Sequence, residues 1–182
     1  PQPTIFPAPR IAFVNDRDGW MLVADPPGTQ CQAQTVRLYR TSDGAATWQL
    51  LDARGIADRQ CKDTLAFTDP SHGYITAGDV NGPPIIYRTS DGGLTWTAST
   101  PLPDPPGFTT VGAGVTLRAG PVANFGSSLF VDGTGYGGGR EVNYIYQSSD
   151  GGATWSHSAT APQDGVPAVF LTPSRWIQLV FG

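Results

Sequence analysis

Short runs in which β-branched and aromatic residues alternate with polar ones recur along the chain. Three such runs, 36–40 (Val-Arg-Leu-Tyr-Arg), 85–88 and 144–147, each lead into a turn-like segment. Enrichment in these residue types with a period of two is typical of strands that bury one face. The pattern therefore predicts an all-β protein.

The segment after each run is one motif written three times, and we call these segments the box turns. They are 41–48 (Thr-Ser-Asp-Gly-Ala-Ala-Thr-Trp), 89–96 (Thr-Ser-Asp-Gly-Gly-Leu-Thr-Trp) and 148–155 (Ser-Ser-Asp-Gly-Gly-Ala-Thr-Trp). Asp-Gly-Gly between two strands predicts a hairpin, because the Asp side chain accepts backbone N–H bonds and glycine adopts positive φ without steric cost. The tryptophan then starts the next strand and packs inward.

The box residues are assigned a structural role. They are Asp43, Thr47, Trp48, Asp91, Thr95, Trp96, Asp150, Thr154 and Trp155. The first copy has Ala45 where the others have Gly93 and Gly152. Its turn is therefore expected to be either slightly strained or differently shaped.

A second repeated element lies upstream of each box turn: an aromatic residue, a polar turn, then glycine and an aromatic. Its copies are 13–20, 67–74 and 130–136, and a fourth copy at 170–176 has no box turn after it. Each unit thus contains four antiparallel strands, which predicts β-propeller blades. The expected blades are approximately 8–55, 62–103 and 112–162, with a half blade at 166–182, in a single partial propeller.

The pattern Ser/Thr-x-Asp-x-Gly-x-Thr-Trp resembles the Asp-box, or bacterial neuraminidase repeat, of a superfamily of β-propellers. Sialidases, sortilin-type receptors, xyloglucan-degrading hydrolases and photosystem II stability/assembly-factor-like propellers share it, so it implies a fold rather than a function. In that superfamily the box lies at the periphery, away from the axial face that carries ligand sites. The resemblance therefore implies no site at Asp43, Asp91 or Asp150.

The box turn combined with Phe-x-Asp-x-x-x-Gly-Trp/Tyr is similar to the assembly-factor-like branch, in which nearly every blade carries both elements. Blades one and two match this pattern closely, and blade three matches it more loosely. The resemblance implies a non-catalytic scaffold or recognition module with a protein or glycan partner.

An Asp-box glycoside hydrolase of the sialidase type is the alternative. That family needs an arginine triad, an aspartate acid/base and a tyrosine activated by a glutamate. Arg10-Ile11-Ala12 resembles its Arg-Ile-Pro motif, and Asp25 falls in the acid/base region, but Ala12 replaces the proline. Glu141 is the one glutamate in the sequence. The remaining catalytic residues would have to lie beyond this chain.

The composition excludes several other classes. The 182 residues include 23 Gly and 17 Pro, which disfavours long helices, and 14% are charged with a net charge of −4. Basic residues form no cluster, so neither nucleic acid nor an anionic membrane is an expected partner. No apolar run is long enough to span a bilayer. Gly-x-Gly-x-x-Gly at 133–138 leads into a strand instead of a helix, so no nucleotide or other cofactor is expected.

Cys31 and Cys61 are the only cysteines, and with two histidines they are too few for a zinc site, so no metal is expected. Both lie in polar, loop-like segments, which favours a disulfide worth roughly 3 kcal/mol over two free thiols. A disulfide indicates an exported protein, whether periplasmic, cell-surface or extracellular. Residues 1–3 show no signal-peptide pattern.

Three units and a half unit do not close a ring, because propellers typically need four to eight blades. We expect either the first part of a longer propeller or two or more copies that complete one assembly. The Pro-rich segment 100–128 is expected to lengthen blade three as an exposed loop, in which Phe108 either pins the loop to the nearest blade, as we expect, or is an exposed contact residue.

Overall fold

The architecture comes from a computed structural model that describes residues 9–25, 35–58, 60–79, 82–109 and 116–179. Within these ranges all regular secondary structure is β-strand. The described part of the chain contains no helix that could cross a membrane. The prediction of an all-β protein is confirmed.

Two sheets have four antiparallel strands in sequence order. Blade 1 consists of β1 (Arg10–Phe13), β2 (Gly19–Asp25), β3 (Thr35–Thr41) and β4 (Gln49–Leu50). Blade 2 consists of β5 (Cys61–Phe67), β6 (Gly73–Asp79), β7 (Gly82–Thr89) and β8 (Thr97–Ala98). In each, the box turn joins the third strand to the fourth.

Blade 3 differs because its inner edge is split between two short strands. These are β9 (Thr116–Ala119) and β10 (Ala123–Phe125), and both pair with β11 (Ser128–Gly137). β12 (Arg140–Ser148) and β13 (Ser156–Thr160) follow in order. A last hairpin, β14 (Ala168–Thr172) and β15 (Arg175–Gln178), forms a half blade.

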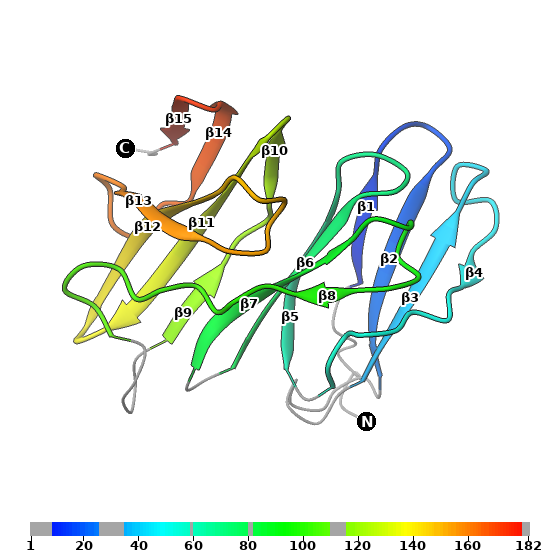
Figure 1. Ribbon diagram of the computed structural model, residues 1–182, viewed down its shortest axis with the longest axis horizontal. Coiled ribbons are helices and arrows are strands. Elements are labelled where there is room, and N and C mark those ends of the chain that lie inside the picture. The colour runs from blue at the N-terminus through cyan, green and yellow to red at the C-terminus, as the bar shows by residue number, and fades with distance from the viewer. Residues whose placement is uncertain (1–8, 26–34, 59, 80–81, 110–115, 180–182) are drawn as a thin grey trace, which may run out of the picture.

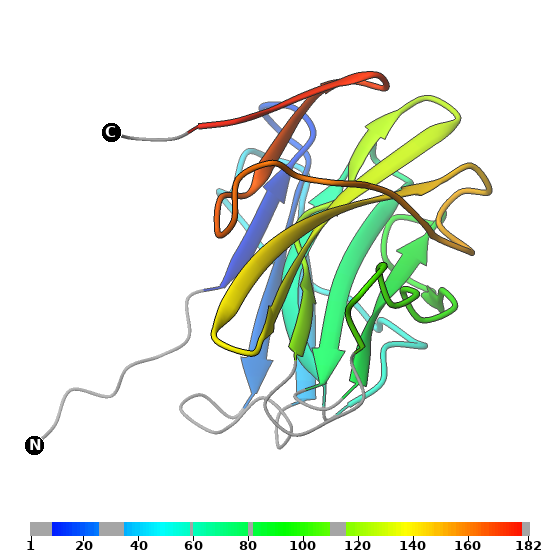
Figure 2. The same cartoon turned by 90° about the vertical axis from the view of Figure 1, so that its left-hand side faces the viewer.

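The sheets lie side by side as blades of an incomplete β-propeller, as the repeats predict (Figure 1). Turning the molecule by 90° shows the blades one behind the other (Figure 2). One apolar cluster fills the seam between blades 1 and 2, where Trp20 stacks on Phe67 with ring centroids 3.8 Å apart. A second cluster fills the seam between blades 2 and 3 and includes Tyr74, Val131 and Tyr146. Burial of these faces drives the stacking.

The third copy of the upstream element is not where the sequence predicted it. Residues 130–136, expected to form a turn, lie inside β11, and the turn falls at 126–127. Phe130, not Tyr136, takes the place of the second aromatic: it lies opposite Gln147, as Trp20 lies opposite Arg40. The physical reason lies in the glycines. A Cβ on Gly133 would approach the Tyr146 ring to 2.7 Å, so this glycine leaves room for a ring instead of forming a turn.

Candidate functional site

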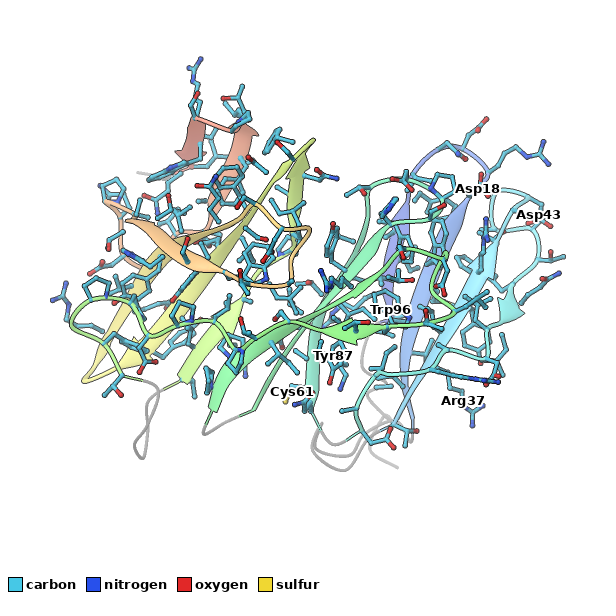
Figure 3. The ribbon with its side chains drawn as sticks, in the orientation of Figure 1. Asp18, Arg37, Asp43, Cys61, Tyr87 and Trp96 are labelled. Carbon is cyan, nitrogen blue, oxygen red and sulfur yellow. The ribbon has the colours of Figure 1, made fainter. Side chains whose placement is uncertain are left out.

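The blades have two ends of different character. The box turns lie at one end, together with the turns between first and second strands: Gly44 N–H donates to Arg17 O at 3.0 Å, and Gly92 N–H to Ser71 O at 2.9 Å. We call this the box end. Figure 3 shows Asp18 and Asp43 at the box end and Cys61 at the opposite end. At that opposite end, the loop end, the inner strands β1, β5 and β9 begin.

Each box turn closes on its own aspartate. In the first, Asp43 Oδ1 accepts from Thr41 Oγ1 at 2.7 Å and from Thr47 N at 2.9 Å, and Oδ2 accepts from Thr47 Oγ1 at 2.6 Å. Asp91 and Asp150 accept the same set from their own turns. These donors lower the pKa of Asp43 and Asp91 to about 2 and that of Asp150 further. The carboxylates are thus engaged in shaping the turn.

The first box turn has the same shape as the other two, and its backbone is strained at Ala45. Ala45 has φ +72°, yet its N–H donates to Thr41 Oγ1 at 3.0 Å, as Gly93 N–H does to Thr89 Oγ1 at 3.1 Å. A Cβ on Gly93 would lie 2.9 Å from Leu38 Cδ2 of the preceding blade, whereas Ala45 is exposed. The methyl group of Ala45 therefore costs free energy only through the positive φ of its backbone.

Charged side chains from three consecutive inner strands meet at the loop end, and we call them the axial charge group. Its members are Arg10 on β1, Lys62 and Asp63 on β5, and Arg118 on β9. Arg10 Nε donates to Asp63 O at 2.7 Å. A bulge in the β5–β6 pairing falls between Lys62 and Thr64, so Asp63 is the extra residue. Bulges redirect side chains and are common beside functional sites.

The Asp63 carboxylate lies near these three cations, which attract it. Its Oδ2 is 3.8 Å from the position a Cβ would take on Gly78, at the seam toward blade 3. Burial raises the pKa of Asp63, and the attraction of Arg118, Arg10 and Lys62 opposes that rise. Both arginines are exposed while Asp63 is half-buried. The guanidinium groups of Arg10 and Arg118 are thus exposed to solvent beside the half-buried carboxylate of Asp63.

Lys62 ties the neighbouring loop to the group. Its Nζ donates to Ala57 O at 2.7 Å and to Gln60 O at 3.0 Å. Burial lowers its pKa to about 8, against the attraction of Asp58 and Asp63. Gln60 Oε1 in turn accepts from Tyr87 Oη at 2.8 Å, so the segment before β5 is held in place.

One face of blade 3 carries a row of polar side chains, which we call the polar stripe. The strand register places on this face Asp132, Thr134 and Tyr136 of β11, Glu141 and Asn143 of β12, and Arg118 of β9. Tyr136 is 40% exposed. Burial and the hydrogen bond with Glu141 raise its pKa, and the attraction of Arg118 offsets only part of this rise. The stripe joins the axial charge group through Arg118.

Arg10, singled out from the sequence, lies in the axial charge group. Asp25 ends β2 opposite Thr35, and its side chain lies outside the described residues. Glu141 does pair with a tyrosine, Tyr136.

Cys61 is disulfide-bonded, at the start of β5 beside the axial charge group. Cys31 lies outside the described residues, so the Cys31–Cys61 pairing stays a prediction. Trp96 and Trp155 are 4% and 6% exposed, while Trp48 is half-buried and packs edge-on against Phe13. Phe108 is partly buried against Tyr144, as expected of a residue that pins its loop, but the segment 100–128 is not an exposed loop throughout, because β9 and β10 lie within it and Leu102 and Leu117 are buried.

Sequence reasoning missed Lys62, Asp63 and Arg118. Lys62 and Asp63 are consecutive but belong to no motif, Arg118 lies far along the chain, and only the stacking of the blades and the bulge at Asp63 bring these groups and Arg10 to one place. In the part of the chain that the structure describes, no three His, Cys, Asp or Glu side chains gather as a metal site.

No family model matches the chain, and no curated protein sequence matches it. Two solved structures are similar. One, "YCF48 bound to D1 peptide", has a TM-score of 0.52 at 17% identity and covers 97% of this chain and 55% of that one. The other, a GH74 xyloglucanase from Xanthomonas campestris, has a TM-score of 0.50 at 19% identity and covers 78% of this chain and 19% of that one. The chain thus shares the β-propeller fold and spans about half of the first protein and a fifth of the second.

Proposed function

We propose that this chain is a non-catalytic recognition propeller that binds an acidic segment of a protein partner at the loop end. The axial charge group is the observation that carries this. Three cations surround one acid there, in a chain whose net charge is −4. Exposed guanidinium groups bind carboxylates through paired hydrogen bonds, which supports an acidic partner.

The similar YCF48 structure supports a protein partner, because that propeller was solved with a bound peptide. In this chain the inner strands would supply the contact surface and the box turns would only hold the blades. We propose that the box turns are the Asp-boxes of the superfamily; their shared hydrogen bonds support this assignment.

Two further points are part of the proposal. The disulfide at Cys61 supports an exported protein, since such bonds persist in oxidising compartments. The ring would be completed either by further blades of the same protein or by another copy of the chain. Light scattering across a concentration series distinguishes these arrangements, because only association between copies changes the molar mass.

Charge reversal at the loop end tests the proposed function. We would measure binding of Asp/Glu-rich peptides by calorimetry for the wild type, for Arg10→Glu with Arg118→Glu, and for Arg54→Glu. Arg54 is the matched control, because its exposed side chain pairs with Asp52 at 2.6 Å, outside the axial charge group. We expect the double variant to lose at least tenfold in affinity, about 1.4 kcal/mol, and the control to keep it.

Equal affinities for the double variant and the wild type would contradict binding at this site. If the wild-type protein binds neutral glycans on an array but no acidic peptide, the proposed partner is a glycan and not a protein. Circular dichroism of both variants verifies that they are folded.

The glycoside hydrolase alternative has one observation in its favour, the contact of Tyr136 with Glu141 near Arg118. It predicts hydrolysis of a sialoside or of xyloglucan by the whole protein. If Arg10→Ala abolishes such turnover without unfolding the protein, the recognition proposal is wrong.

A further inference from the structure

The axial charge group contains one acid, Asp63. This residue is half-buried on β5 and lies near Arg10 of β1, Lys62 of β5 and Arg118 of β9. With Lys62 protonated, three cations and one carboxylate leave the group with two positive charges instead of three. An acid at a surface that is proposed to bind acids lowers the attraction of that surface for its partner.

The position of Arg10 does not depend on the Asp63 side chain. Arg10 Nε donates to the main-chain oxygen of Asp63 at 2.7 Å. Among the residues that the structure describes, no hydrogen bond or ion pair joins the Asp63 carboxylate to a cation of the group, and the cations act on it by attraction at longer range. The main chain of Asp63 therefore positions Arg10, and the side chain contributes charge.

The Asp63 carboxylate lies at the seam toward blade 3. Its Oδ2 is 3.8 Å from the position that a Cβ would take on Gly78, and that position is 3.9 Å from Leu117 O, in the residue before Arg118. Asp63 is the extra residue of the bulge in the β5–β6 pairing. Because a bulge changes the direction of a side chain, it accounts for an acid of β5 beside the strand that carries Arg118.

A partner bound at the exposed arginines would come close to Asp63. Arg10 and Arg118 are both exposed, so a carboxylate of the partner can reach their guanidinium groups from solvent. That carboxylate is attracted by the arginines and repelled by Asp63. The repulsion is stronger than between two fully exposed acids, because the half-buried Asp63 carboxylate is partly removed from water.

We propose that Asp63 is an internal competitor of the partner: its negative charge weakens the binding of an acidic segment at the axial charge group, and its protonation strengthens that binding. This inference rests on the proposed function, because it concerns the same site. Protonation takes one proton from solvent and changes no other covalent bond. A bound anion in turn favours the protonated form of Asp63, since the two equilibria are linked.

The direction of the pKa shift agrees with this role. Burial raises the pKa of Asp63, although the attraction of Arg118, Arg10 and Lys62 lowers it. Asp63 thus takes up its proton at a higher pH than an ordinary aspartate does. A bound anion would raise this pKa further, because it repels the charged form. Binding should therefore strengthen as the pH falls through the pKa of Asp63.

Other ionisable groups lie around Asp63 and along the polar stripe. Besides the three cations, they are Asp58 before β5, which attracts Lys62, Asp132, Tyr136 and Glu141 of the polar stripe, and Asp25 and Asp79 at the ends of β2 and β6, whose side chains lie outside the described residues. All of these groups remain in a variant of Asp63. The difference between the variant and the wild type therefore isolates the Asp63 charge.

Calorimetry with a peptide of constant charge tests the competition. The probe is a peptide whose acidic residues are cysteic acid, because a sulfonate stays ionised over the whole pH range and the partner's own titration does not contribute. We would measure its affinity for the wild type, Asp63→Asn and Asp52→Asn between about pH 4 and 8. Asp52→Asn is the matched control, since it removes an exposed carboxylate that pairs with Arg54, outside the axial charge group.

At pH 7 we expect Asp63→Asn to bind the peptide at least about threefold more tightly than the wild type, and Asp52→Asn to match the wild type. The wild-type affinity should approach that of Asp63→Asn as the pH falls, and the profile of the variant should be flatter. A carbon NMR titration of the Asp63 carboxyl needs no variant: saturating peptide should raise its pKa.

The result that overturns this inference differs from the one that overturns the proposed function. If the wild type binds the peptide, Arg10→Glu with Arg118→Glu does not, and Asp63→Asn binds equally or more weakly, Asp63 is not a competitor and the proposed function stands. If neither the wild type nor Asp63→Asn binds the peptide, the proposed function is wrong and the inference fails with it. Binding by Asp63→Asn alone would support the competition.

Discussion

The indole Nε1 of Trp20 donates to the carbonyl oxygen of Gly92 at 2.9 Å, so the second strand of blade 1 is bonded to the box turn of blade 2. Arg88 of blade 2 reaches the box turn of blade 3 in a similar way, from Nη1 to Asp150 O at 3.4 Å. The box turns thus serve as attachment points for the preceding blade. Their aspartates shape the turn, and their backbone carbonyls receive the neighbour.

Replacing Trp20 with phenylalanine should separate the hydrogen bond from the packing. The Gly92 carbonyl would lose its indole donor in a buried seam, which costs about 1–3 kcal/mol. Trp20→Ala should cost about 3–5 kcal/mol, because the stack on Phe67 is also lost. Urea denaturation measures both. A Trp20→Phe protein as stable as the wild type would contradict a linking role for the bond; Trp48→Phe, in a half-buried residue, is the control.

Ala45 and Gly93 should respond in opposite directions to the exchange of glycine and alanine. Gly93→Ala places a Cβ 2.9 Å from Leu38 Cδ2 at φ +96°, and we expect a loss of about 2 kcal/mol. Ala45→Gly relieves the strain at φ +72° in an exposed turn, and we expect a gain of about 0.5–1 kcal/mol. Thermal unfolding of the two variants gives the sign of each, and a loss of stability in Ala45→Gly would show that the turn is not strained.

The box carboxylates should make the protein sensitive to strong acid. Hydrogen bonds from Thr95 and Thr89 lower the pKa of Asp91 to about 2, below its value in the unfolded chain. Such a group stabilises the fold above the unfolded pKa near 4, and the stabilisation is lost as the pH falls toward 2. The free energy of unfolding, measured between pH 5 and 2, should therefore decline. Asp91→Asn should flatten that decline in part, whereas Asp52→Asn should not.

Asp132 should give a pH dependence of the opposite sign. Its pKa in the folded protein is raised to about 6, above the unfolded value. The stabilisation it contributes is fully present below the unfolded pKa and is lost as the pH rises through about 6. Stability should thus fall between about pH 4 and about pH 7 in the wild type, and Asp132→Asn should remove this fall. An unchanged slope in the variant would assign the dependence to another group.

Local chemistry made the box turns predictable. All donors to Asp43 come from its own turn, between Thr41 and Thr47. A turn that is stabilised by contacts within a few residues can be predicted from those residues alone. The three hairpins and the strands around them were therefore predicted from the sequence. The alternation of apolar and polar positions likewise predicted strands, because each blade buries its faces in the seams.

The third upstream element shows where local reasoning fails. Glycine and an aromatic at 135–136 look like the pairs at Gly19 and Gly73, which begin β2 and β6, yet Gly135 lies inside β11. A Cβ there would lie 3.0 Å from the rings of both Phe108 and Tyr144, so its glycine is required by neighbours far away in the chain. Gly19 and Gly73 also leave space for a ring, since a Cβ on either would lie 2.6 Å from the ring of Phe13 or Phe67, but those rings stand only six residues earlier in the chain. The sequence does not show which ring a glycine has to accommodate.

By itself, then, the sequence determined the all-β class, the blade repeat and the internal bonding of each box turn, because these depend on neighbouring residues and on a period of two. Tertiary structure alone decided the axial charge group and the buried hydrogen bond between Asn143 and Asp132. Arg10 and Asp63 are 53 residues apart, and the stacking of blades and a bulge bring them together. The partners of Asp132, Asn143 and Ala168, likewise follow from the register of β11 with β12 and from the position of β14. Such contacts depend on how separate strands pair, which no local pattern specifies.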